Sequence, residues 1–252
     1  MLQLRWLWQA LIIAFPAAPV TLAQLNLPQG YWADKNAILY ISVILLVLGV
    51  SSSIISEIAA SLQAPAVRRF NDELYKVLLA TLISVTLKTE SDMFKVGVHA
   101  FRISKGPFRR RLINIGSARL GSEPKMVDPR WTRGKGVVGK AWHEGNCVGV
   151  RWDRVYKEAQ KLGREAWENK APADRFGLNW QELWLTGGYR IIVAAPIIDA
   201  ATGTISGCVA IDFPGDAAKL LTPEIQLILR DVTTKLQEIP RPPLVWTGAP
   251  TR

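Results

Sequence analysis

The sequence predicts an α+β fold, an antiparallel sheet sandwiched by helices, preceded by an N-terminal transmembrane hairpin. Three observations predict it. An uncharged stretch at 36–56 is long enough to cross a bilayer, segments with strand patterns lie between residues 93 and 214, and helical patterns flank them at 67–85 and 222–236. Strands that are grouped rather than alternating with long helices favour one layered domain over a doubly wound parallel sheet.

The stretch NAILYISVILLVLGVSSSIIS carries no charge between Lys35 and Glu57. About 20 helical residues, rising about 1.5 Å each, span a hydrocarbon core of about 30 Å. A buried core helix of this length would normally include a charged position. We therefore expect a transmembrane helix at 36–56.

A second uncharged run covers residues 6–33 and is interrupted by two prolines. It is either a first span at about 6–24, in which neighbouring groups satisfy the carbonyls that the prolines free, or a signal peptide with Arg5 in its n-region and a cut after Ala23. We prefer the first span, because two spans with a short connection form a compact hairpin within residues 1–57.

The second span is followed by the basic residues Arg68, Arg69 and Lys76. The loop before this span carries only Asp34 and Lys35 as charged residues. Positively charged flanks stay on the cytoplasmic side of a membrane. Both interpretations of the N-terminus thus place the soluble domain in the cytoplasm, attached to the inner (plasma) membrane.

Pro65 is expected to break the chain after the second span, and a connector helix follows within 58–90. Its apolar residues keep helical spacing: Val67, Phe70, Leu74, Val77, Leu78, Leu82 and Val85. This stripe packs on the domain or pairs with a second copy of the chain, and both alternatives stay open.

The domain itself is expected within 91–238, followed by a Pro-rich tail at 239–252. Strand patterns and the turns between them predict strands near 93–104, 109–120, 147–150, 189–200 and 204–214. Short and charged helical patterns occur at 134–145 and 151–170. Thr222 as the cap and Pro223 in the first turn mark the start of the closing helix.

Three stretches carry a family resemblance: GKGVVGKAW (134–142), RIIVAAPIID (190–199) and GTISGCVAIDFP (203–214). With the closing helix, they resemble a GAF domain, the small-ligand sensor module of many signalling proteins. The resemblance covers roughly residues 70–238 and implies a ligand pocket beside the helix that starts near 134. The helical insertion from 151 to about 186 is longer and more charged than the family's pattern.

The signature of cyclic-nucleotide-binding members is absent, since the place after the last strand reads Ile211-Asp212 and later Pro223-Glu224. The resemblance therefore does not imply cyclic GMP recognition in the family's manner. The glycines at 134–139 do not form a dinucleotide fingerprint either, because a basic loop with Pro129, rather than a strand, precedes them.

Positive charge is concentrated between Arg102 and Lys140, where 11 Lys or Arg accompany two acidic residues. Arg grips phosphate with paired hydrogen bonds, and polybasic segments bind anionic lipid. The candidate ligand-binding residues are Arg130, Trp131, Arg133, Lys135, Trp142 and Arg190. The candidate membrane-surface residues are Arg68, Arg69, Arg109, Arg110 and Arg111. Nucleic acid is an unlikely partner, because no recognised nucleic-acid motif accompanies the charge.

The sequence does not favour an enzyme or a cofactor. Two His, His99 and His143, do not make a His-rich metal site, and the two Cys, Cys147 and Cys208, suit a reducing compartment. Cys147 follows the pocket helix, and a branch of the GAF family reduces methionine sulfoxide with cysteines in this neighbourhood, but such chemistry generally needs a resolving thiol.

Together these features predict a membrane-anchored GAF-like sensor that binds a small anionic ligand, with a nucleotide as a candidate, and signals to a partner, a second copy in a homodimer or its own membrane segments. A ligand-gated effector that perturbs the membrane is the first alternative. A scaffold that binds only protein is the second.

Overall fold

The computed structural model describes residues 14–25, 27–28, 36–104, 110–121, 129–213, 219 and 222–240. The chain divides into two compact units, Met1–Ala66 and Val67–Arg252, so the boundary lies one residue after Pro65. Within the first unit, residues 14–24 are helical. Among the described residues, no helix combines the length and the apolar character needed to cross a membrane.

Helix α2 (Asn36–Thr89) is continuous and contains Pro65 in its interior. The expected break at Pro65 is therefore wrong. Proline removes one intrahelical hydrogen bond and crowds the preceding turn, but the turns on both sides keep their own bonds in a helix of 54 residues.

The second unit is built on a five-stranded sheet with the spatial order β2-β1-β5-β4-β3, and each adjacent pair is antiparallel. The strands are β1 (Gly97–Ile103), β2 (Leu112–Arg119), β3 (Val148–Val150), β4 (Ile191–Ile198) and β5 (Ile205–Phe213). The predicted hairpin of the first two strands and the consecutive pairing of the last two are confirmed.

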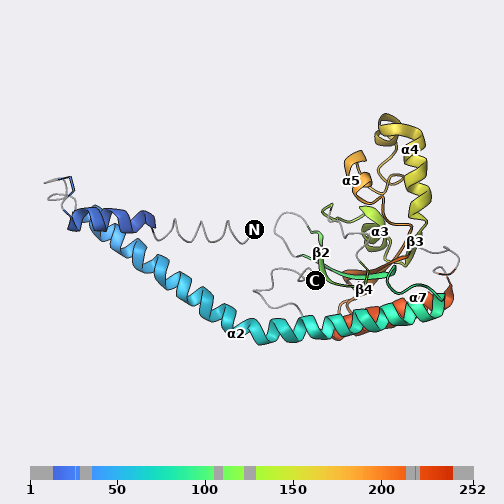
Figure 1. Ribbon diagram of the computed structural model, residues 1–252, viewed down its shortest axis with the longest axis horizontal. Helices are drawn as coiled ribbons and strands as arrows, with labels where there is room; N and C mark the ends of the chain where they lie inside the picture. The colour runs from blue at the N-terminus through green and yellow to red at the C-terminus, as the bar shows by residue number, and fades with distance from the viewer. Residues whose placement is uncertain are drawn as a thin grey trace. The chain divides into compact units, whose positions relative to one another are not determined.

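One face of the sheet is covered by α2, from Phe70 to Val85, and by α7 (Pro223–Glu238), which run along it side by side (Figure 1). The apolar stripe predicted for 67–85 thus packs on the domain. Thr222 caps α7 by accepting a hydrogen bond from the Ile225 amide, as expected. This layer shares a buried core with alternate strand residues such as Val98 and Ile211.

The opposite face carries the remaining helices, α3 (Gly136–Glu144), α4 (Trp152–Asn169) and α5 (Trp180–Leu185) (Figure 1). Trp152, Ala159, Trp167 and Leu183 pack there in a second buried core. The insertion expected from 151 to about 186 therefore forms part of this layer. Leu162, three positions after the buried Ala159, is 41% exposed.

Candidate functional site

A pocket opens on the sheet face that α3, α4 and α5 cover. Its described lining residues are His99, Phe101, Trp131, Gly136, Val137, Val138, Trp152, Thr186, Tyr189, Ile192, Ala210 and Asp212. The cavity volume is about 40 Å³, within about 490 Å³ of empty space that includes the part open to solvent. Since one water needs about 10–15 Å³ on the first measure, the enclosed part has room for about three or four waters.

The pocket lies there because strand residues alternate between the two faces of a sheet. In β1, Val98 and Ala100 enter the core beneath α2, so His99 and Phe101 face the pocket. In β5, Val209 and Ile211 enter the same core, so Ala210 and Asp212 face the pocket.

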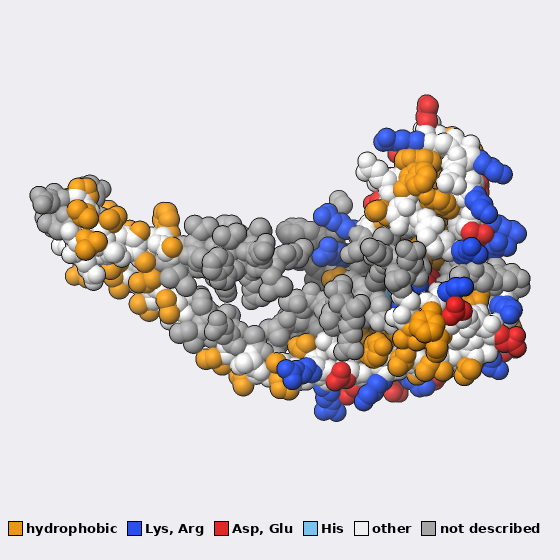
Figure 2. Space-filling model, viewed as in Figure 1, with side chains coloured by type: hydrophobic (Ala, Val, Ile, Leu, Met, Phe, Trp, Pro, Cys, Tyr) orange, Lys and Arg blue, Asp and Glu red, His pale blue; other side chains and the backbone are white. Residues whose placement is uncertain are grey.

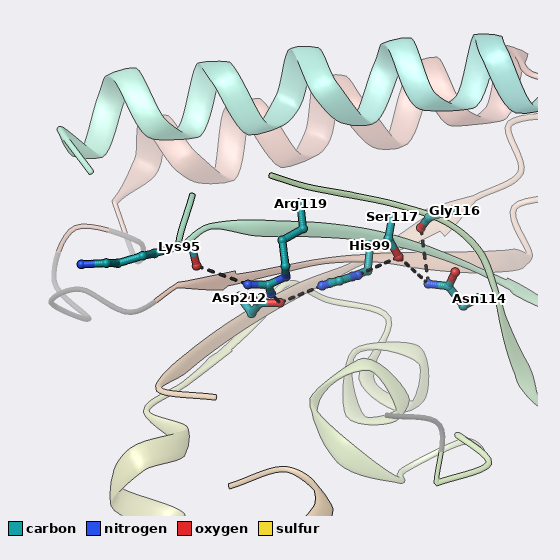
Figure 3. Close-up of polar contacts among 7 residues, drawn as sticks. All are labelled: Lys95, His99, Asn114, Gly116, Ser117, Arg119 and Asp212. Atoms are coloured by element: carbon teal, nitrogen blue, oxygen red, sulfur yellow. Dashed lines mark hydrogen bonds and ion pairs between the residues drawn. The ribbon is translucent and has the colours of Figure 1, made fainter. Parts of the chain in front are cut away.

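A buried polar network crosses three strands at this face (Figure 3). We call it the sheet network; its residues are His99, Asn114, Ser117, Arg119 and Asp212. His99 Nε2 lies 2.7 Å from Asp212 Oδ2, and His99 Nδ1 lies 2.9 Å from Ser117 Oγ. Asn114 Nδ2 donates to Ser117 Oγ at 3.2 Å.

Arg119 binds both carboxylate oxygens of Asp212 and also donates to the Lys95 carbonyl at 3.4 Å. The pairing of β2, β1 and β5 places Arg119, Gly97 and Asp212 in one row across the sheet. A Cβ on Gly97 would lie 2.2 Å from an Arg119 nitrogen and 2.7 Å from Asp212 Oδ2. The missing side chain at Gly97 therefore lets Arg119 reach Asp212 across β1.

Asp212 is charged in this environment. Its burial raises the pKa of the carboxyl, but the hydrogen bond from His99 and the charges of His99 and Arg119 more than offset this effect, so the pKa lies below its ordinary value. The pair with Arg119 is nearly dry, since the side chains are 10% and 4% exposed. Removing one partner of such a pair costs about 3–5 kcal/mol.

The lowered pKa of Asp212 predicts an acid-dependent loss of stability. Because the folded pKa lies below the ordinary 3.8, the contribution is fully present above that pH and disappears as pH falls through the folded pKa. We expect Asp212→Asn to be less stable than the wild type at neutral pH, with the gap narrowing below about pH 4. Urea unfolding of both proteins from about pH 7 to about pH 3 measures this difference in the free energy of unfolding. A difference that stays constant over this range would contradict the lowered pKa of Asp212.

The sheet network was not predicted from the sequence, which assigns no partner to His99. His99 and Asp212 are separated by 113 positions, so no local motif connects them. The available signal was a titratable residue inside each of two otherwise apolar strands, GVHAFRI and ISGCVAIDF.

A serine, a histidine and an aspartate linked by hydrogen bonds also make up the catalytic triad of serine hydrolases, with the serine as nucleophile and the histidine as base. Here, however, Asp212 is bound by Arg119, and Ser117 is not among the described residues that line the pocket. A molecule bound in the pocket would therefore not meet the Ser117 hydroxyl. The arrangement supports a structural role for the network.

The loop before α3 shapes the mouth of the pocket. Gly136 has a φ of 64°, and a Cβ there would lie 2.3 Å from the Trp131 ring, which packs on it. The Trp131 Nε1 atom is buried without a hydrogen-bond partner. The loop is held by bonds from the Lys135 amide to the Thr132 carbonyl and from the Gly136 amide to the Phe176 carbonyl.

Of the candidate ligand-binding residues, only Trp131 lines the pocket. Lys135 pairs with Glu182 and donates to the Pro129 carbonyl at 2.8 Å, so its charge is neutralised. Trp142 is buried in the core of the α3 layer. Arg130, Arg133 and Arg190 are exposed and lie outside the described lining.

The candidate membrane-surface residues Arg68, Arg69, Arg110 and Arg111 are exposed, and Arg69 pairs with Glu73 at 2.9 Å. Arg109 lies outside the described residues.

The two cysteines differ in exposure but share the direction of their pKa shift. Burial raises the pKa of the Cys208 thiol to about 12, and this thiol donates to the Val138 carbonyl. Cys147 reaches the surface, yet desolvation by neighbouring atoms raises its pKa as well. Reactive cysteines have lowered pKa values, and both of these shifts lie in the opposite direction. No group of residues in the described part of the chain is arranged to hold a metal ion.

No family model and no curated protein sequence matches the chain. Solved structures similar to it include the GAF domain of an Acinetobacter phosphoenolpyruvate-protein phosphotransferase (14% identity, 71% of this chain, 92% of that chain, TM-score 0.41). A GAF sensor protein from Burkholderia vietnamiensis, described as putative, has 16% identity over 72% of this chain and 94% of its own, with a TM-score of 0.39. A type II free methionine-R-sulfoxide reductase from Thermoplasma acidophilum has 13% identity over 66% and 96%, also with a TM-score of 0.39.

These likenesses are too distant to transfer a ligand or an activity to this chain. The classification rests on the chain's own architecture. A five-stranded antiparallel sheet lies between two helical layers, and the three GAF-like stretches form α3, β4 and β5 around the pocket. The chain has a divergent GAF-like fold.

Proposed function

We propose that the chain is a membrane-anchored GAF-like sensor that binds a small cytoplasmic ligand in the pocket between the sheet and α3. The observation that carries the proposal is the pocket itself. It is concave, has mainly aromatic and aliphatic walls, and includes the buried pair His99 and Asp212. Ligand sites usually combine apolar walls with a few oriented polar groups.

The pocket and α2 contact opposite faces of the same strands. His99 and Asp212 face the pocket, while their neighbours Val98 and Ile211 pack in the core with Leu78 and Leu82 of α2. A shift of β1 or β5 on ligand binding would therefore change the packing of α2. This connection supports signal transfer along α2 to a partner, to a second copy or to the N-terminal segment.

Membrane anchoring is supported by the side chains of the first unit. In α2, exposed apolar residues follow one another from Ile38 to Val50, and Figure 2 shows no charged side chain on the described part of this segment. A large exposed apolar surface indicates an interaction with lipid or protein. The exposed Arg68, Arg69, Arg110 and Arg111 suit contact with anionic lipid.

Thermal unfolding of the full chain in mild detergent, with a panel of metabolites, nucleotides and ions, tests ligand binding. A ligand at 100 times its dissociation constant stabilises the folded state by about 2.7 kcal/mol. We expect at least one compound to raise the melting temperature, and we expect a filled pocket in Ala210→Val to remove the shift while Arg133→Ala keeps it.

The reverse pattern, with the shift lost only in Arg133→Ala, would move the ligand to the basic loop. A broad panel without any shift would favour the protein-binding scaffold, and ligand-dependent dye leakage from liposomes would favour the membrane-perturbing effector. Recovery of the chain from cell membranes by detergent, but not by high salt or alkaline carbonate, tests the anchor.

A further inference from the structure

We propose that the pocket selects a small, uncharged, apolar ligand and excludes anions. This inference rests on the proposed sensor function and names the ligand class of the same site. It departs from the anionic ligand that the charge pattern of the sequence predicts.

The charge around the pocket is the first argument. None of the described residues that line it is Lys or Arg, and the one carboxylate among them is Asp212. Arg119 neutralises this carboxylate by binding both of its oxygens, and Arg119 itself is not among the lining residues. An anion that enters the pocket would therefore approach a carboxylate, and the one imidazole in the described wall is already bonded to that carboxylate.

The polar groups of the wall are the second argument. His99, Asp212, Trp152 and Thr186 already have hydrogen-bond partners, and the unpartnered Trp131 Nε1 is itself buried. His99 uses one ring nitrogen toward Ser117 and the other toward Asp212. Thr186 Oγ1 accepts from Trp152 Nε1 at 3.0 Å and donates to the Leu183 carbonyl at 2.6 Å. A charged ligand would lose its hydration without gaining equivalent partners, which disfavours its transfer into the pocket.

The walls are the third argument. Aromatic rings surround the space, contributed by Phe101, Trp131, Trp152 and Tyr189, and aliphatic groups complete it. Such walls favour an apolar body, which gains from leaving water, and they favour offset or edge-on contact with a ring. The small enclosed volume limits the inserted part to about one small ring or a short branched chain.

Toluene is a suitable probe for the apolar class, and nitrate, inorganic phosphate and cyclic GMP represent the anions. Each is titrated into the full chain in mild detergent, with the methyl NMR signals of Val137, Val138 and Ile192 as the readout of the pocket. We expect toluene to shift these signals saturably and the anions to leave them unchanged.

Two variants change the size of the pocket in opposite directions. Ala210→Val fills it, and we expect the toluene affinity to fall at least tenfold. Ile192→Ala enlarges it, and we expect the affinity to rise several-fold, which keeps the test decisive if Ala210→Val does not fold. Ala118→Val is the matched control, because it adds the same methyl groups in the core on the other face of the sheet and should leave the affinity unchanged.

Anions that shift the pocket signals, with toluene inactive, would overturn the ligand class and leave the sensor function standing. Toluene binding that ignores Ala210→Val and Ile192→Ala would also overturn it, since the probe would then bind elsewhere. If neither toluene nor any anion shifts the signals in the wild type or in Ile192→Ala, the ligand class fails together with the pocket on which the sensor function rests.

Discussion

Replacement of Gly97 by alanine is expected to destabilise the fold by about 3–5 kcal/mol, the cost of breaking a buried ion pair. The new Cβ occupies the space through which Arg119 reaches Asp212. The Arg119 side chain is flexible at its end, so we expect it to move away rather than the strands to separate. Asp212 then keeps only His99 as a described partner. The midpoint of urea unfolding measures the loss.

A double-mutant cycle separates this explanation from a simple steric one. Arg119→Ala removes the side chain that the Cβ approaches most closely. Gly97→Ala in that background should therefore cost no more than about 1 kcal/mol, the typical cost of a single substitution. Equal costs of Gly97→Ala with and without Arg119 would show that the effect does not act through the pair.

Replacement of Gly139 by alanine is expected to cost about 3 kcal/mol, the upper end of the range for groups inserted into well-packed sites. Its Cβ would lie 2.2 Å from the Thr132 carbonyl oxygen and 3.3 Å from the Gly134 backbone. These backbone atoms are held in the loop before α3 by the bond from the Gly134 amide to the Gly139 carbonyl at 2.7 Å. The loop must therefore open, which also moves Trp131 at the pocket.

Gly134→Ala is the control in the same loop. A Cβ there meets open space, and only its φ of 80° disfavours alanine, so we expect a cost of about 1 kcal/mol. Thermal unfolding ranks the two variants. A cost of Gly134→Ala equal to that of Gly139→Ala would mean that backbone conformation, not the close approach of Gly139 to Thr132, determines the effect.

The elements of the fold could be predicted because their signals are local. Apolar runs joined by a turn located β4 and β5 to within a few residues, and Thr222 with Pro223 marked the start of α7. Phe94, expected in the first strand, is instead exposed before β1. The local signal of Pro65 was misleading, because the penalty of one proline does not end a helix whose flanking turns are intact.

The site could be predicted only in part. The glycines at 134–139 pointed to the right loop, and Trp131 does line the pocket. The basic residues near Trp131 do not line the pocket. Charge in a sequence does not show whether a side chain is paired, as Lys135 is with Glu182, or exposed, as Arg133 is. His99 and Asp212 meet only through the order of the strands.

A crystal structure of the full chain grown or soaked with an apolar probe, such as toluene or pressurised xenon, tests the central claim most directly. The account predicts ordered density between Trp131, Ile192 and Ala210, with Arg119 still bound to Asp212. Density for the probe only outside this pocket, or a pocket that takes phosphate in contact with Arg130 and Arg133, would contradict it.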